Sequence, residues 1–362
     1  MTFTLSTTIK VPSAVSALSL GPGEELCVGC DDGSVRWYSL PSTKVSRAVK
    51  SLRDEISSIV WTRPKKNEDA SVWVASGRKI FRFPRTSQQM IMSIEDASCS
   101  IVAGEDEEDL LNEAGWLRLL NLSENGKFLA FGSDSGSVGI VDISSNKITH
   151  MRNSHTTVCG CVRFVPDRPS ELLSGGYDSA LLHFDIGQGG ILSRFDIAAP
   201  PPTSQGVSLS PPFVLSIAIN DAGLLAASTA DGRVWLGGGG EKRPATSQVG
   251  KKKRSRKWEG LKEDEGLWLQ VADGPVVATA FRESGQLFTC SLLGVLSEYK
   301  VSRDAQALLQ ATQVWSSSVT SVEKVNTMAI GHTWLVVGGF GEDEKGVVEV
   351  WRHGDQGTQP TS

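Results

Sequence analysis

The sequence predicts an all-β protein folded as a β-propeller of seven blades. The first observation is a repeated unit: a short apolar strand, a second strand that ends in small residues, a tight turn, and a third strand with an aromatic side chain near its end. The second is that no segment keeps the 3.6-residue period of a long helix, whereas apolar and polar residues alternate as strands require. The third is that the 37 glycines and 15 prolines fall mostly between these strands.

The repeated unit occurs seven times along the chain. Its first copy has strands at 15–20, 26–30 and 35–38, with the turn Asp31-Asp32-Gly33-Ser34 between the second and the third. Glycine suits such turns because it adopts a positive φ at little cost. The third, fourth and fifth copies keep this order, and the second, sixth and seventh are degraded. The copies predict blades at about 11–50, 54–97, 114–152, 155–198, 212–272, 275–315 and 318–353.

The segment from Phe3 to Ile9 precedes the first copy and belongs to none of them. Because the last copy has only three strands, we expect residues 3–9 to pair with it as its fourth strand. That pairing closes the ring and leaves no sheet edge open. Residues 1–353 then form a single propeller domain, followed by a polar tail at 354–362.

Composition restricts the classes of function. Lysine and arginine total 36 against 41 for aspartate and glutamate, and the net charge of −5 argues against a general nucleic-acid binder. No apolar run approaches the roughly 18 residues of a membrane span, and the N-terminus lacks the features of a secretory signal. We therefore expect the protein in the cytoplasm, the nucleus or both.

The six cysteines fit no disulfide framework, and Cys27-x-x-Cys30 lacks the further ligands of a zinc site. We expect no metal, cofactor or small-molecule substrate.

A basic run is the strongest local charge feature. It lies in an insertion at 237–265, between the third and fourth strands of the fifth copy, and the glycines at its start predict that this insertion is flexible. The run suits a nuclear-localisation signal, or a contact with RNA or an acidic protein, and a merely solvated loop is the alternative. Its charged residues are Lys251, Lys252, Lys253, Arg254, Arg256 and Lys257.

The fourth copy carries the residues of a known family. Ser154 and His155 precede its first strand, and Ser174, Asp178 and Phe184-Asp185 mark its second strand, turn and third strand. This arrangement resembles the WD40 repeat, in which a His, a Ser or Thr, a turn Asp and a Trp form a hydrogen-bonded chain. The resemblance implies such a structural chain through His155, Ser174 and Asp178. It must end at Ser174, because Phe184 replaces the tryptophan and has no donor.

The same three residue types also form the triad of many hydrolases. A nucleophilic serine needs an exposed hydroxyl and an oxyanion hole. Ser174 instead lies inside a predicted strand, between Leu173 and Gly175, without a nucleophile-elbow motif. We therefore interpret the three residues as structural and expect no catalytic site.

The resemblance implies a non-enzymatic scaffold that presents the loops of a rigid propeller to protein partners. Candidate partner contacts are aromatic residues in loops and turns, namely Trp116, Tyr177 and Phe340. One alternative is a substrate receptor of a cullin-four-type ubiquitin ligase, and another is a chaperone or assembly factor for a basic client such as a ribosomal protein. Such receptors commonly carry Trp-Asp-x-Arg at the end of a third strand, and this sequence departs from it with Phe184-Asp185-Ile186-Gly187.

Overall fold

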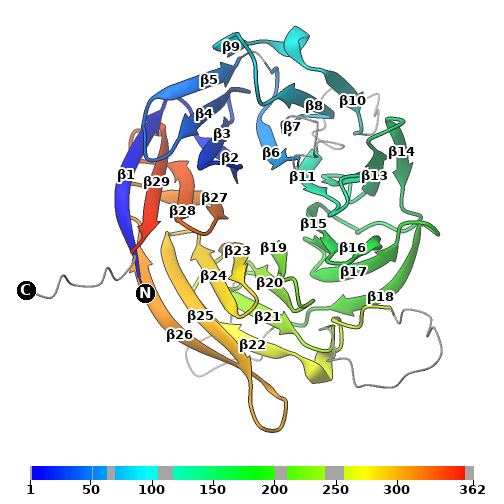
Figure 1. Ribbon diagram of the computed structural model, residues 1–362. Helices are drawn as coiled ribbons and strands as arrows, with labels where there is room; N and C mark the ends of the chain where they lie inside the picture. Colours follow the sequence, from blue (N-terminus) through cyan, green and yellow to red (C-terminus); the bar gives the residue numbers. More distant parts are fainter. Residues whose placement is uncertain are drawn as a thin grey trace, which may run out of the picture. The chain divides into compact units, whose positions relative to one another are not determined.

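The computed structural model describes residues 2–50, 52–62, 70–104, 117–199, 210–240 and 257–354. These residues form seven β-sheets, labelled by strand in Figure 1. The predicted fold class, an all-β propeller with seven blades, is confirmed. The chain divides into two compact units, each of which is described by itself: Met1–Gly104, Cys290–Ser297 and Trp315–Ser362 in the first, and Glu105–Thr289 and Glu298–Val314 in the second.

The first unit contains blades 1, 2 and 7. Blade 1 has strands β2 (Val15–Leu20), β3 (Glu25–Cys30), β4 (Val35–Ser39), β5 (Val45–Val49) and β9 (Ile91–Met92); blade 2 has β6 (Ile56–Trp61), β7 (Ser71–Ser76), β8 (Lys79–Pro84) and β10 (Cys99–Val102); blade 7 has β27 (Lys324–Ile330), β28 (Trp334–Phe340), β29 (Gly346–His353) and β1 (Phe3–Val11). A single 3-10 turn, η1 (Ile94–Asp96), lies between β9 and β10.

The second unit contains blades 3, 4 and 5. Blade 3 has strands β11 (Leu117–Leu122), β12 (Phe128–Ser133), β13 (Val138–Asp142) and β14 (Lys147–His150); blade 4 has β15 (Cys159–Val165), β16 (Arg168–Gly176), β17 (Ala180–Asp185) and β18 (Gly190–Asp196); blade 5 has β19 (Val214–Ile219), β20 (Leu225–Thr229), β21 (Arg233–Gly237) and β22 (Leu267–Gln270). The 3-10 turn η2 (Glu263–Glu265) precedes β22. The sheet of blade 6 consists of β23 (Val276–Glu283), β24 (Gln286–Ser291), β25 (Val295–Arg303) and β26 (Leu309–Ser318).

The N-terminal strand β1 is the outer strand of blade 7, as the sequence predicts. It runs antiparallel to β29, from Phe3 opposite His353 to Val11 opposite Gly346. The side chains of Phe3, Ile9 and Val11 are buried. Ile9 and Val11 join a cluster that also includes valines of β28 and β29 and the start of β2. The strand therefore contributes both backbone hydrogen bonds and apolar packing to the first unit.

The second blade differs from its expected span of 54–97. Its outer strand is β10, which begins at Cys99, while Ile91 and Met92 leave the blade and add a parallel fifth strand, β9, to blade 1. The amides of Ala48 and Lys50 donate to the carbonyls of Met90 and Met92. The physical reason is that the outer strand of blade 1 has free backbone groups, and the long connection after β8 is near enough to satisfy them.

The Asp-Gly turns adopt the backbone that the sequence predicts. Gly33, between β3 and β4, has a φ of +73°, and a Cβ there would lie 1.7 Å from the carbonyl oxygen of Leu52. Gly232, between β20 and β21, has a φ of +89°, and a Cβ there would lie 2.0 Å from the carbonyl oxygen of Ala272. Glycine is needed at both turns because φ is positive there and because a carbonyl oxygen of the following loop leaves no room for a Cβ.

The apolar core lies between neighbouring blades of each unit. In the first unit, Trp37 of blade 1 packs in one cluster with Ile56 and Phe81 of blade 2. In the second unit, Trp235 of blade 5 packs against Phe195 of blade 4, with 4.3 Å between the ring centroids. These tryptophans therefore join adjacent blades, which fixes the positions of the loops at the blade ends.

The first strand of each blade, its inner strand, packs beside the inner strands of the neighbouring blades within its unit. Side chains of one inner strand form hydrogen bonds with the backbone of the inner strand in the neighbouring blade. In the first unit, Ser16 Oγ donates to Ile56 O (2.7 Å), and Asn326 Nδ2 donates to Val15 O (2.9 Å). In the second unit the links are Phe164 N to Asn121 Oδ1 (2.8 Å), Arg163 Nε to Ile217 O (3.2 Å) and Thr279 N to Ser216 Oγ (3.2 Å).

Candidate functional site

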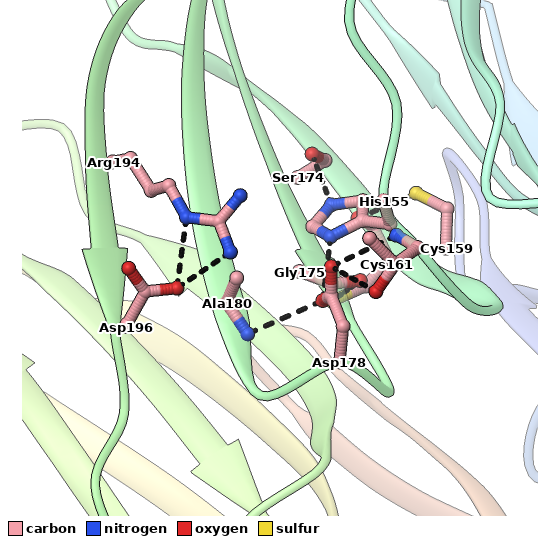
Figure 2. Close-up of polar contacts among 10 residues, drawn as sticks. His155, Cys159, Cys161, Ser174, Gly175, Asp178, Ala180, Arg194 and Asp196 are labelled. Carbon is pink, nitrogen blue, oxygen red and sulfur yellow. Dashed lines mark hydrogen bonds and ion pairs between the residues drawn. The ribbon is translucent and has the colours of Figure 1, made fainter.

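The structure places His155, Ser174 and Asp178 together in blade 4 (Figure 2). Nδ1 of His155 lies 2.8 Å from Oδ1 of Asp178, and Nε2 lies 2.7 Å from Oγ of Ser174. A carboxylate can only accept, so Nδ1 carries the proton and Nε2 accepts from the serine hydroxyl. Asp178 also accepts from the amides of Thr156 and Ala180. The group therefore ties the loop before β15 to the turn between β16 and β17.

This connectivity matches that of a serine hydrolase triad, but the burial of its members does not. The exposed fraction is 0% for Ser174 and 2% for His155. A nucleophile acts only where its hydroxyl can reach a substrate. Burial lowers the pKa of His155, although the neighbouring Asp178 raises it. The arrangement therefore holds a neutral imidazole between two partners inside the blade, and a structural role explains it better than a catalytic one.

We expect His155→Ala to lower the free energy of unfolding by about 1–3 kcal/mol, because the mutation removes a buried partner from both Ser174 and Asp178. Burial by itself raises the pKa of Asp178, but its hydrogen bonds to Thr156 and His155 outweigh this and lower the pKa. Since the pKa values of His155 and Asp178 are both lowered on folding, the unfolded chain binds more protons in acid. The stabilisation should be present at pH 7 and be lost as the pH falls below about 6.5.

Calorimetric melting between pH 5 and 8 measures both effects. The wild type should lose Tm towards pH 5 more steeply than His155→Ala does. His332→Ala is the matched control because His332 is exposed, and it should leave the Tm and the pH profile unchanged. An unaltered Tm in His155→Ala would contradict the structural role.

Tyr177 lies in the turn between β16 and β17, and its ring stacks on Phe213, just before β19. The ring centroids are 5.5 Å apart and the planes are 13° from parallel. Both rings are partly exposed. The ring of Tyr177 also covers Gly160 in β15, where a Cβ would lie 2.9 Å from Tyr177 Cε1. The pair therefore consists of two nearly parallel rings, each of which is partly exposed.

Two charged groups accompany this aromatic pair. Arg118, in β11, forms an ion pair with Asp134, in the turn after β12. Burial raises the pKa of Tyr177, while Arg118 lowers it and Asp134 raises it, so both charges act on the phenol. The side chain of Arg118 remains 39% exposed. We call Tyr177, Phe213, Arg118 and Asp134 the Tyr177 surface.

The other residues that the sequence singles out lie apart from the Tyr177 surface or outside the described residues. Phe340, in the first unit, is partly exposed at the end of β28, and Nζ of Lys324 lies 5.9 Å from its ring centroid. Trp116 lies outside the described residues, as do Lys251, Lys252, Lys253, Arg254 and Arg256. Lys257 is described and exposed, and its Nζ donates to Leu192 O (3.2 Å).

Sequence reasoning missed the anchor of the insertion at 237–265, whose described end does not behave as a loose loop. The indole of Trp258 is buried and its Nε1 donates to Gly223 O (2.9 Å). The amide of Trp258 donates to Glu171 Oε2 (3.0 Å), which also lies 2.9 Å from Nε2 of His183. The rings of His183 and Trp258 meet edge to face, with centroids 5.3 Å apart. A single tryptophan after a basic run gives no periodic signal from which this contact could be found.

The cysteines provide neither disulfides nor a metal site in the described residues. All six are free, and burial raises the pKa of Cys30 to about 11 and that of Cys161 to about 12. These two thiols therefore stay protonated near neutral pH and are poor nucleophiles. No group of three or more His, Cys, Asp or Glu side chains suited to a metal ion gathers in the part of the chain that the structure describes.

Comparison with known proteins gives a partial match. Over 135 residues the chain is 29% identical to WD repeat-containing protein 53 homolog of Dictyostelium discoideum. The match covers 32% of this chain and 36% of that protein, about a third of each. No protein-family model matches the chain. Among the described residues, no helix has the length and apolar character needed to cross a bilayer. The partial match and the seven blades together support a propeller of the WD-repeat type.

Proposed function

We propose that this protein is a non-enzymatic scaffold that binds protein partners through loops of its propeller. The observation that carries the proposal is the Tyr177 surface, in which a stacked aromatic pair and an accessible arginine are held by three different blades. The partial likeness to a WD repeat-containing protein supports it, because the resemblance to WD40 repeats implies a non-enzymatic interaction platform. The inaccessible hydroxyl of Ser174 agrees with a role other than hydrolysis.

Rigidity of the Tyr177 surface favours binding. Aromatic and arginine side chains supply most of the binding energy in protein interfaces, and they do so best when little motion is lost on binding. Phe213 stacks on the ring of Tyr177, and Gly160 leaves room for that ring beside β15. The Asp134 carboxylate orients Arg118. A partner would therefore meet a surface that is already ordered.

Affinity purification from cells tests the proposal. We expect the double variant Tyr177→Ala/Phe213→Ala to recover at least one partner of the wild type about 30-fold less well, which is the loss of about 2 kcal/mol typical of one hot spot. Leu308→Ala is the matched control, because Leu308 is an exposed hydrophobic residue (62%) on a connecting loop. Phe340→Ala tests the remaining aromatic candidate separately. The same set of partners in all four proteins, at equal recovery, would contradict the assignment.

The identity of the recovered proteins separates the alternatives. Recovery of the adaptor propeller of a cullin-four ligase would favour a substrate receptor, although Asp185 does not stand in a Trp-Asp-x-Arg motif and its Oδ1 instead accepts from the amides of Gly187 and Gln188. Recovery of a basic client that is lost at high salt would favour a chaperone or assembly factor, because salt screens attraction between exposed charges.

A further inference from the structure

Arg163 stands out among the links that join the inner strands. At four other links, two in each unit, the side chain is a neutral serine or asparagine. Arg163 makes the same kind of contact, from β15 to Ile217 O in β19, through Nε alone. A neutral amide would suffice for that bond. The rest of the guanidinium, with four N–H donors on its two terminal nitrogens, is therefore not explained by the link.

The surroundings of this guanidinium contain donors but no counter-charge. Among the described residues, Arg163 has no ion pair and no second hydrogen bond. The four inner strands β11, β15, β19 and β23 carry three arginines, Arg118, Arg163 and Arg282, and one carboxylate, Glu283, at the last residue of β23. A cation left without a carboxylate beside it is costly when it is partly buried, unless an anion completes the site.

The neighbouring links also leave donors unused. Asn121 accepts the amide of Phe164 with its oxygen, so its Nδ2 keeps two N–H groups, and Phe164 directly follows Arg163. Ser216 accepts from the amide and the hydroxyl of Thr279, so its own O–H remains available, and it directly precedes Ile217. In the described part of the chain these spare groups have no acceptor. Three neighbouring inner strands thus supply the guanidinium of Arg163, the amide nitrogen of Asn121 and the hydroxyl of Ser216 as hydrogen-bond donors.

We propose that Arg163, with Asn121 and Ser216 at the links on either side of it, forms a binding site for a small-molecule oxyanion, with a phosphoryl or carboxylate group as the recognised part. A guanidinium matches either group with two parallel hydrogen bonds. Arg163 as a whole residue remains partly exposed. Such a site is distinct from the Tyr177 surface, and its occupancy does not depend on any protein partner.

Burial also lowers the pKa of the Arg163 guanidinium below its ordinary value, with Cys161 as the only other contributor. Among the described residues, no carboxylate contributes to this shift. A bound anion would offset this desolvation, so binding should stabilise the folded protein in proportion to its affinity.

The experiment uses the full-length protein and two probes, inorganic phosphate and citrate, each titrated at an ionic strength held constant with sodium chloride. We expect at least one probe to raise the Tm of the wild type. A rise with phosphate indicates recognition of a phosphoryl group, and a rise with citrate indicates recognition of a carboxylate. Arg163→Gln keeps a donor for Ile217 O but removes the charge. It should bind the effective probe at least about tenfold more weakly, the loss expected for one charge-assisted hydrogen bond.

Arg194→Gln is the matched control, because Arg194 is an exposed arginine of the same blade that pairs with Asp196. It should bind like the wild type. If Arg163→Gln does not fold, Arg163→Lys decides the question, since lysine keeps the charge but loses the planar fork and should weaken binding several-fold. The proposal is overturned if neither probe raises the wild-type Tm, or if the Arg163 variant that folds binds as tightly as Arg194→Gln.

Discussion

A chain without residues 2–10 is expected to melt about 10 °C or more below the intact protein, or to fail to fold. The deletion removes nearly all of β1, so the outward groups of β29 lose their backbone partners. It also removes Phe3 and Ile9, which are each 3% exposed. Burial of each such side chain contributes about 1.5–3 kcal/mol, and the total stability of a folded protein is only about 5–15 kcal/mol. Calorimetry measures the difference directly.

Two controls separate the loss of this strand from the loss of length. Removal of 355–362, which lie outside the described residues, should leave the Tm unchanged. A synthetic peptide of residues 2–11, added to the shortened chain, should restore part of the lost Tm because it can refill the edge of β29. A shortened chain that melts like the wild type would show that β1 adds nothing to blade 7.

Trp258→Ala is expected to lower the free energy of unfolding by about 3–5 kcal/mol, more than the loss expected for His155→Ala. The indole is 2% exposed and fills a space that three glycines leave open: a Cβ at Gly223, Gly240 or Gly260 would approach it to 3.4, 2.1 or 1.9 Å. The mutation therefore creates a cavity and also leaves the carbonyl of Gly223 without its donor.

Urea denaturation of two further variants gives the comparison. Trp258→Phe keeps a large ring but loses the Nε1 donor, and it should cost about 1–2 kcal/mol. Trp268→Ala removes a partly exposed tryptophan of the same blade, and should cost less than Trp258→Ala because water already reaches part of the ring. Equal losses in Trp258→Ala and Trp268→Ala would refute the assignment of Trp258 as an anchor.

The repeats can be predicted from the sequence, whereas most contacts between repeats cannot. Asp-Gly turns such as Asp32-Gly33 mark where a second strand ends, because few other residues adopt that backbone. The segment at 3–9, which belongs to none of the repeats, identifies the strand that completes blade 7. By contrast, β9 contains two residues and pairs with a strand about 40 positions earlier, and no alternation in so short a segment predicts a partner.

The same limit applies to the functional residues. His155 and Asp178 are found from their places in the repeat, since one precedes the blade and the other sits in its turn. Phe213 follows a proline-containing stretch, and nothing in that stretch indicates that it stacks on Tyr177. Glu171 is a buried carboxylate on β16, where alternation alone suggests an exposed residue, and only its contacts with His183 and Arg168 explain its position. Contacts across blades depend on the packing of side chains and not on local spacing.

The pairing of β1 with β29 also has a consequence for synthesis on the ribosome. Nearly the whole chain lies between these two strands, and translation at about 5–20 residues per second takes on the order of tens of seconds to reach the second one. During that time the apolar side chains of Phe3 and Ile9 lack the packing partners that bury them in the folded protein. The nascent β1 must therefore stay unpaired, or be shielded by a chaperone, until β29 emerges.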